Sequence, residues 1–207
     1  MSLDVRALLE ETGALLTGHF RLSSGLHSPN YVQCARLLEH PRNAKALGAA
    51  LAERLLNVGR ASARLPRGGR AEAHPTLNKI VSPALGGVII GYAVAQALDV
   101  PFVFTERKDG AMTLRRGFGI REGERVVIVE DVVTTGKSTR ETVDVIARQG
   151  GDVTGFASIL NRSGKANPFD KPYEALLDLE LATYPEDACP QCSQEVPLDA
   201  PGSRYSR

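Results

Sequence analysis

Two adjacent carboxylates followed by a turn of small, hydroxyl-bearing residues form the part of this chain best suited to chemistry. The acids are Glu130 and Asp131, and the turn that follows contains Thr134, Thr135 and Gly136. Backbone amides in such a turn can converge on one anion, hydroxyls add further donors, and the start of the next helix adds a favourable dipole. The segment therefore predicts a phosphate pocket beside an acid pair.

An acid pair that faces a phosphate is repulsive unless the ligand also brings hydroxyl groups or a divalent cation. A sugar phosphate meets both needs, because its hydroxyls donate to the carboxylates while the amides hold the phosphate. The competing interpretation is a strand end with solvated acids and a helix cap. We favour the sugar phosphate because the acids and the turn occur together.

Gly136-Lys137-Ser138 also matches the end of the nucleoside-triphosphate loop pattern G-x-x-x-x-G-K-[ST]. The first glycine of that pattern would fall at position 131, which is an aspartate. A carboxylate there repels the phosphates that the loop should admit, so this alternative is rejected.

The elements around this motif predict an α/β fold, with a mainly parallel sheet flanked by helices. Residues 125–129 are a continuous β-branched run, typical of a central strand that is buried on both faces. The spacing of Ser138 and Glu141 fits a capping box and predicts a helix over 138–149. Strands alternating with helices indicate βαβ units; further strands are expected at 79–81, 101–104, 155–160 and 173–181, and a helix at 86–98.

The first 76 residues give weaker signals for helices and strands. Apolar spacing indicates a helix within 2–16 that ends near Gly13, and Pro41 is suited to start another helix. Residues 18–33 are expected to be irregular or short-stranded. The arginine-rich stretch 59–76 is interpreted as a mobile surface insertion, since a solvated loop is a simpler reading than a nucleic-acid contact.

Composition excludes several classes of protein. The 207 residues carry a net charge of +1 and no tryptophan, which argues against nucleic-acid coating and base stacking. The most apolar stretch, 81–104, is interrupted by polar residues and cannot span a membrane, and the acids near the N-terminus do not fit a signal peptide. We expect a cytoplasmic globular protein with no nucleic-acid or membrane partner.

The string over residues 126–139 resembles the 5-phosphoribosyl-1-pyrophosphate (PRPP) motif of type I phosphoribosyltransferases. The resemblance implies that fold, with the acids on the ribose hydroxyls and the turn on the 5-phosphate. The residues that it assigns to PRPP in this motif are Glu130, Asp131, Val132, Val133, Thr134, Thr135, Gly136, Lys137 and Ser138.

Other segments resemble the orotate-specific members of that family. Residues 18–31 are similar to their N-terminal hood, and Arg162 stands after a strand where they place an arginine against the orotate carboxylate. The implied activity is transfer of the phosphoribosyl group from PRPP to orotate, which gives orotidine 5′-phosphate and pyrophosphate in pyrimidine biosynthesis. The residues expected to bind orotate are Ser23, Tyr31, Thr134 and Arg162.

The resemblance also implies the groups that act on pyrophosphate. Gly86 and Gly87 lie in a segment similar to the pyrophosphate loop, and Arg107 and Lys108 begin what resembles the mobile catalytic loop. Asp131, Arg107 and Lys108 are the expected catalytic residues. Loop 107–117 is expected to close over the site, with Gly110 and Gly117 as hinges, and Mg²⁺ is expected as the cofactor, held mainly by substrate.

The departures from the family pattern affect the basic residues. Many members carry lysines where this chain has Ser23 and Gly86, and the loop over 112–118 has Arg115 and Arg116 instead of the usual lysine and histidine. The two arginines could supply the missing charge, or they could belong to an exposed basic hairpin. In the relatives that loop reaches a neighbour's site, so a homodimer is implied.

Two alternative functions stay open. A purine phosphoribosyltransferase would keep the fold and change the base. A non-catalytic regulator that binds PRPP or a nucleotide would need a DNA-binding segment or a broad basic face, and the sequence offers neither outside the short insertion.

A Cys-x-x-C pair near the C-terminus, Cys189 and Cys192, supplies two of the four ligands of a structural zinc site. Zinc would need Cys34, a histidine or a partner chain as well, so a reduced pair without a ligand is favoured over a weak zinc site. His19 and His27 are interpreted as structural. We expect one domain over 1–185, with a hood over about 1–40, and a tail over 186–207 that is poorly ordered from Pro197.

Overall fold

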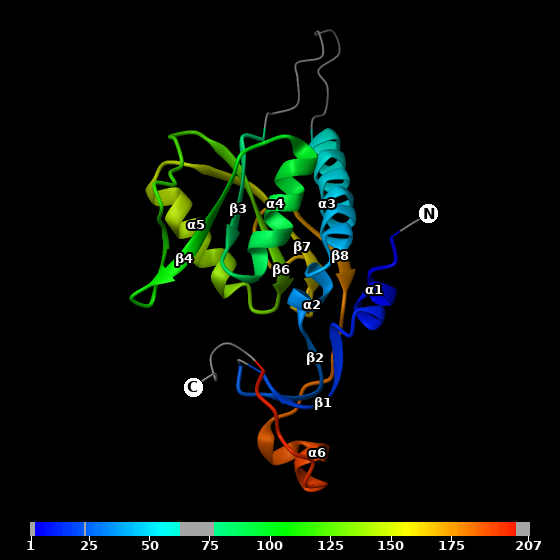
Figure 1. The fold of residues 1–207 in the computed structure, drawn as a ribbon. Coiled ribbons are helices and arrows are strands. Elements are labelled where there is room, and N and C mark those ends of the chain that lie inside the picture. The colour runs from blue at the N-terminus through cyan, green and yellow to red at the C-terminus, as the bar shows by residue number, and fades with distance from the viewer. Residues whose placement is uncertain (1–2, 23, 63–76, 202–207) are drawn as a thin grey trace. The chain divides into compact units, whose positions relative to one another are not determined.

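The computed structural model describes residues 3–22, 24–62 and 77–201 (Figure 1). These residues form two compact units. The first consists of Leu38–Asp178, and the second combines Asp4–Leu37 with the chain from Leu179 onward. The sequence analysis placed a boundary at residue 185, whereas the structure groups the segment from Leu179 with the N-terminal hairpin.

The first unit is built on a six-stranded sheet with the strand order β5-β4-β3-β6-β7-β8. Its strands are parallel except for β5, which pairs antiparallel with β4. The mainly parallel α/β fold expected from the sequence is thus confirmed. The strands are β3 (Lys79–Pro83), β4 (Phe102–Lys108), β5 (Ala111–Leu114), β6 (Arg125–Val133), β7 (Asp152–Asn161) and β8 (Tyr173–Asp178).

Three long helices accompany this sheet: α3 (Pro41–Ser62), α4 (Gly86–Leu98) and α5 (Lys137–Arg148). The chain moves from β3 through α4 to β4 in one direction and from β6 through α5 to β7 in the other. Right-handed crossovers therefore put α4 and α5 on opposite faces of the sheet. The strand order reverses between β3 and β6, and the carboxyl ends of strands at such a switch point form a natural ligand crevice.

Strand β6 is buried on both faces, as its β-branched sequence predicts. Because side chains alternate across a strand, Val126 and Ile128 point to one face, where they join a core cluster with Ile146 of α5 and Phe156 of β7. Val127 and Val129 are also buried and therefore face the other side. This double burial fixes the end of β6, where the acid pair lies.

The second unit contains the hairpin of β1 (Leu15–Arg21) and β2 (His27–Val32), with α1 (Val5–Glu11) before it. The C-terminal segment pairs with both outer edges of this hairpin. His27 exchanges backbone hydrogen bonds with Tyr184, and the Asp199 amide donates to the His19 carbonyl. This unit also contains the 3₁₀ turn η1 (Glu186–Ala188) and the short helix α6 (Pro190–Ser193), while α2 (Cys34–Leu38) leads into the first unit.

The first helix ends at Glu11, close to Gly13 as expected, because Gly13 has a positive φ of 60°, and Leu15 and Leu16 belong to β1. Two other local expectations from the sequence are wrong. Helix α3 extends to Ser62, so the expected insertion over 59–76 begins as helix, and residues 63–76 lie outside the described residues. The C-terminal segment is described as far as Pro201, beyond the point at Pro197 where order was expected to be lost, because Asp199 is bonded to β1.

No helix in the described part of the chain is both long and apolar enough to cross a membrane.

Candidate active site

The acid pair lies near the carboxyl end of β6. Glu130 is buried and Asp131 is partly buried. Burial raises the pKa of Glu130 well above its usual value, and the neighbouring Asp131 carboxylate raises it further, while a hydrogen bond from Thr139 acts in the opposite direction. Burial also raises the pKa of Asp131, against hydrogen bonds from the backbone. Among the described residues no lysine or arginine forms an ion pair with either carboxylate.

The corner between β3 and α4 packs directly on these acids. A Cβ atom on Gly86 would lie 2.5–2.7 Å from the Asp131 carboxylate, and one on Gly87 would lie 2.9 Å from the Val129 carbonyl oxygen and 3.2 Å from Glu130 Oε2. A side chain at Gly87 would meet the backbone of β6, and a side chain at Gly86 would displace the Asp131 carboxylate. The peptide bond between Ala84 and Leu85, just before this corner, is cis. The structure thus brings together the glycines and the acids that the sequence assigned to one ligand.

Helix α4 begins at this corner without a side-chain cap, since the N-cap residue Leu85 makes no capping hydrogen bond. The first amides of a helix have no partner within the helix, and they carry the positive end of its dipole. They therefore offer an anion site beside the acid pair.

A second uncapped helix start follows the acids along the chain. Thr134 and Thr135 are exposed after β6, and α5 begins at Lys137 with Gly136 as its N-cap residue, at a positive φ of 69°. The capping box expected from Ser138 and Glu141 is wrong, because the helix starts one residue earlier and its N-cap has no side chain. The Lys137 amide donates to Thr135 Oγ1 at 3.3 Å, so the hydroxyl of this turn lies beside the first amides of α5, where a phosphate could accept from both.

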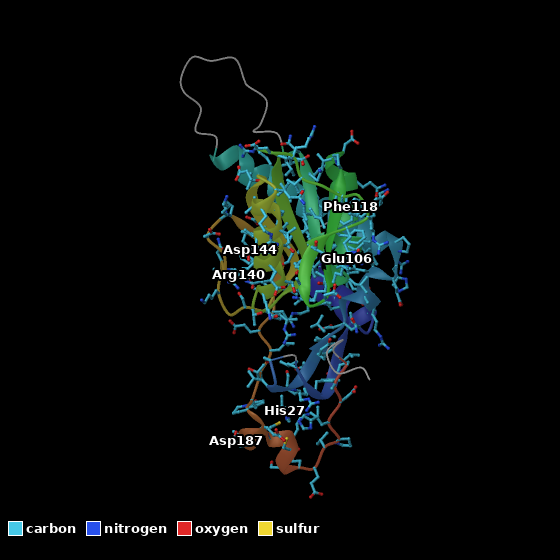
Figure 2. All side chains as sticks on the ribbon, turned by 90° about the vertical axis from the view of Figure 1, so that its left-hand side faces the viewer. His27, Glu106, Phe118, Arg140, Asp144 and Asp187 are labelled. Atoms are coloured by element: carbon cyan, nitrogen blue, oxygen red, sulfur yellow. The ribbon has the colours of Figure 1, made fainter. Side chains whose placement is uncertain are left out.

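Arg140 holds the backbone of this turn, and the sequence analysis missed it. Its guanidinium donates to the Thr135 carbonyl at 2.5 Å and to the Pro168 carbonyl at 2.9 Å. It also lies over the ring of Phe169, 5.6 Å from the centroid. Figure 2 labels Arg140 on α5. No motif marks this residue, because its role depends on a loop that lies 28 residues further along the chain.

The basic residues of the predicted catalytic loop are held in a β-hairpin. Strands β4 and β5 pair from Thr105 to Leu114, and the turn contains Asp109 and Gly110, both with positive φ. Arg107 forms an ion pair with Glu141 of α5 and donates to the Gly110 carbonyl at 2.8 Å, while Lys108 is exposed.

Arg115 and Arg116, which follow β5, both pair with Glu106 of β4. Figure 2 labels Glu106. Arg116 also lies over the ring of Phe104, 5.7 Å from its centroid. These contacts are those of a basic hairpin, one of the two interpretations left open by the sequence.

The residues expected to bind orotate are distributed over both units. Arg162 follows β7, and its amide donates to the carbonyl of Val133 at 2.7 Å, which fixes its backbone beside the end of β6. Asn161 supports this turn by donating to Asp178 Oδ1 at 2.7 Å and accepting from Ser163. Tyr31 lies on β2 in the second unit, with its ring centroid 5.8 Å from that of Phe20, and Ser23 lies outside the described residues.

Known proteins similar to this chain share one family. A model of the phosphoribosyl transferase domain matches residues 36–184. The chain belongs to the phosphoribosyltransferase family. Full-length relatives in this family include proteins named orotate phosphoribosyltransferase from Thermotoga maritima (43% identical, 97% of this chain and 98% of that protein) and from Carboxydothermus hydrogenoformans (44% identical, 98% of each).

Solved structures support the same phosphoribosyltransferase fold. The orotate phosphoribosyltransferase of Aeropyrum pernix gives a TM-score of 0.62 at 24% identity and covers 85% of this chain and 94% of that chain. An adenine phosphoribosyltransferase from Thermoanaerobacter pseudethanolicus gives 0.58 at 17% identity, with 83% and 99% covered. The fold alone is therefore shared by enzymes named for different bases.

Proposed function

We propose that the chain transfers the phosphoribosyl group of PRPP to orotate and releases orotidine 5′-phosphate and pyrophosphate. The full-length identity of 42–44% to relatives that carry the name orotate phosphoribosyltransferase supports orotate as the base. The observation that carries the proposal is structural: two helix starts whose N-cap residues form no side-chain capping bond flank the acid pair at the switch point of the sheet, and no described lysine or arginine forms an ion pair with either acid.

PRPP has phosphate groups at both ends of a ribose and hydroxyls between them, and this site matches that order. The first amides of α5, with Thr134, Thr135 and Ser138, receive the 5-phosphate. Glu130 and Asp131 accept from the two ribose hydroxyls, and the amides of Gly86 and Gly87 receive the pyrophosphate. Arg140 is a positioning residue, because it holds the turn through the Thr135 carbonyl.

During the reaction the bond between C1 and the pyrophosphate oxygen breaks, and N1 of the orotate anion forms the new bond to C1. Positive charge develops on the ribose, and negative charge leaves with pyrophosphate. The Asp131 carboxylate stabilises the first, and the amides of α4 stabilise the second, because both are held in place before reaction. Arg107 and Lys108 are proposed to add positive charge near pyrophosphate, with Arg107 exchanging its Glu141 partner for the ligand.

The donor set also fits Mg²⁺. Two carboxylates without a cationic partner, next to phosphate-binding amides, are oxygen ligands of the kind that Mg²⁺ prefers. Glu130 and Asp131 would hold the ion through the ribose hydroxyls, and when bound it neutralises charge on the departing pyrophosphate. We propose Mg²⁺ as the cofactor on this basis.

We further propose a homodimer in the cytoplasm. Helix α4 carries an exposed apolar stripe formed by Leu85, Ile89 and Tyr92, whose spacing puts them on one helix face. Their exposed fractions are 86%, 48% and 60%, which is unusual for a contiguous apolar stripe on a free surface. A second copy of the chain is the occupant that the family resemblance implies.

The test of the activity is a spectrophotometric assay of the purified chain with PRPP, Mg²⁺ and orotate, in which orotate absorbance should fall and pyrophosphate should appear. Arg162→Gln should lower kcat/KM for orotate by about 100-fold, since a charged hydrogen bond to a carboxylate contributes about 1.5–3 kcal/mol. Its KM for PRPP should stay near the wild-type value. Arg148→Gln, an exposed arginine in the last turn of α5, is the matched control.

Other outcomes separate the alternatives. Turnover of adenine or hypoxanthine without turnover of orotate would replace the proposed base with a purine. PRPP binding without turnover of any base would indicate a regulator.

A further inference from the structure

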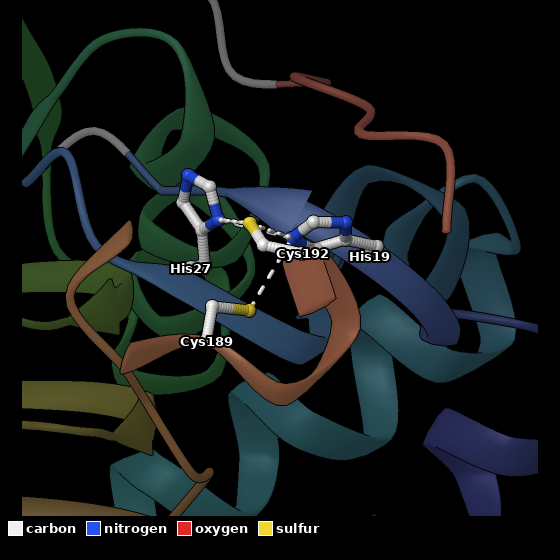
Figure 3. A group of neighbouring side chains, drawn as sticks. All are labelled: His19, His27, Cys189 and Cys192. Atoms are coloured by element: carbon white, nitrogen blue, oxygen red, sulfur yellow. Dashed lines mark hydrogen bonds between the residues drawn. The ribbon is translucent and has the colours of Figure 1, made fainter. Parts of the chain in front are cut away.

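Four potential metal ligands meet in the second unit, and none of them is among the residues assigned to PRPP. His19 lies on β1, His27 begins β2, and Cys189 and Cys192 flank the start of α6 (Figure 3). One ligand atom from each residue lies within 4.8 Å of all the others. Figure 3 shows the four side chains pointing toward one another.

The distances match the edges of a tetrahedral zinc site. Zn–N bonds of about 2.05 Å and Zn–S bonds of about 2.3 Å give edges of about 3.3 Å between nitrogens and about 3.6 Å between nitrogen and sulfur. The observed His19 Nε2 to His27 Nδ1 distance is 3.0 Å. Cys189 Sγ lies 3.5 Å from His19 Nε2, and Cys192 Sγ lies 3.7 Å from His19 Nε2 and 3.2 Å from His27 Nδ1.

The hydrogen bonding of His19 selects the tautomer that can bind a metal. Its Nδ1 lies 2.8 Å from the Val196 carbonyl oxygen, which can only accept, so Nδ1 carries the hydrogen. In the neutral ring this leaves the lone pair on Nε2, the atom that faces the cluster. A backbone carbonyl that orients a ligating histidine in this way is the usual outer shell of a protein metal site.

The burial and the charge of the four side chains fit a bound Zn²⁺ ion. His19, His27 and Cys189 are exposed by 3% or less, and Cys192 is partly buried. Two thiolates balance the two charges of Zn²⁺, so the occupied site is neutral and can be buried at low cost. All three cysteines of the chain are free of disulfides.

We propose that His19, His27, Cys189 and Cys192 form a structural zinc site. Four protein ligands complete the tetrahedron and leave no open position for a substrate. The ion would fasten the C-terminal segment to the hairpin, where Gln191 already donates to the Gly18 carbonyl at 2.9 Å and Asp199 is bonded to β1. This revises the sequence interpretation of an unliganded Cys-x-x-C pair.

Metal content of the full-length, untagged chain tests this proposal directly. Protein produced with zinc in the medium and purified under reducing conditions should contain one zinc per chain by plasma mass spectrometry. Cys189→Ser/Cys192→Ser should lose at least nine-tenths of it. Cys34→Ser is the matched control, because Cys34 is also a buried cysteine but lies outside the cluster, and it should keep the full content.

The absorption spectrum of the cobalt-substituted protein identifies the ligands of the metal, and it does so in a protein that remains folded. The apo protein with Co²⁺ should show the visible bands of tetrahedral cobalt and a thiolate-to-cobalt charge-transfer band. His27→Cys should keep one metal per chain and strengthen the charge-transfer band, since a third thiolate replaces an imidazole. A variant that merely unfolds would give neither result.

Chelation of the wild-type chain gives a readout that needs no substitution. Removal of zinc should lower the melting temperature, and added Zn²⁺ should restore it, because a metal that binds only the folded state stabilises it. Absence of zinc from the wild-type chain, zinc content unchanged in the double serine variant, or a Cys189–Cys192 disulfide in the purified protein would each overturn the proposal. None of these readouts depends on turnover, so failure of the proposed enzyme activity would be separately visible.

Discussion

Glu130 and Asp131 lower the stability of the folded chain when both are ionised. Burial and their proximity raise the pKa of Glu130, and burial raises that of Asp131, so their charged forms are disfavoured in the folded chain. The folded state therefore binds more protons than the unfolded state over the interval between the two sets of pKa values. Stability falls as pH rises through that interval, and the ionised pair lowers stability at neutral pH.

Substitution of one acid should separate stability from function. Glu130→Gln should raise the melting temperature of the ligand-free protein at pH 7.5 by about 2–4 °C, the shift that about 1 kcal/mol produces at this chain length. The gain should shrink as pH falls through the raised pKa of Glu130 and should be absent below about pH 4, where the carboxyl is neutral in both the folded and the unfolded state. Differential scanning calorimetry across pH measures this.

The same variant should bind PRPP with Mg²⁺ at least about tenfold more weakly, a loss of about 1.4 kcal/mol, by isothermal titration calorimetry. Unchanged affinity together with raised stability would remove Glu130 from the binding site.

Adding a single methyl group at Gly86 should lower activity with PRPP. A methyl group there would overlap the Asp131 carboxylate and displace it, so Gly86→Ala should lower kcat/KM for PRPP by at least about tenfold. Gly119→Ala is the control, since its nearest contact would be Gln149 Oε1 at 3.8 Å. Equal activity of the two variants would contradict the close packing of α4 on the acids.

At the scale of elements, the turn between β6 and α5 is held by Arg140, a residue of α5 itself. Arg140→Ala removes the hydrogen bonds to the Thr135 and Pro168 carbonyls, so it should raise KM for PRPP about fivefold to tenfold with a smaller effect on kcat. Arg140→Lys should recover part of the loss, because lysine can still reach one carbonyl. A fall in kcat alone, with KM unchanged, would argue against a role in holding this turn.

The elements that the sequence predicted well are those whose pattern is local. The β-branched run of β6 and the apolar helix α4 have one strong periodicity each, and both were found as expected. The start of α5 was misplaced because Gly136 caps it through its positive φ, which no side-chain pattern signals. The β1–β2 hairpin was expected only as irregular or short-stranded chain, because its pairing with Tyr184 and Asp199 joins segments that are distant in the sequence.

At the scale of the whole molecule, the apolar stripe on α4 should form the contact between two copies of the chain. Ile89→Glu introduces a charge into that stripe, so it should convert a dimer into a monomer in sedimentation equilibrium. Ala97→Glu adds the same charge to an exposed position of the same helix that lies off this stripe, and it should leave the dimer intact. A wild-type chain that is monomeric at assay concentrations would contradict the proposed dimer.

The sequence could not predict which distant segments of the chain meet in the fold. The acid pair and its turn are close together in the sequence, so a sugar-phosphate site could be proposed from their spacing. The cluster of His19, His27, Cys189 and Cys192 joins segments 170 residues apart, and its two histidines are eight positions apart. That spacing fits no common zinc pattern, so only the folded second unit shows that the four side chains meet.

The most direct measurement of the central claim is a crystal structure of the chain with PRPP and Mg²⁺. We expect the ribose hydroxyls on Glu130 and Asp131, the 5-phosphate on the amides that begin α5, and the pyrophosphate at Gly86 and Gly87. Electron density for the sugar elsewhere, with the two carboxylates and the 134–138 turn free of ligand, would contradict the account.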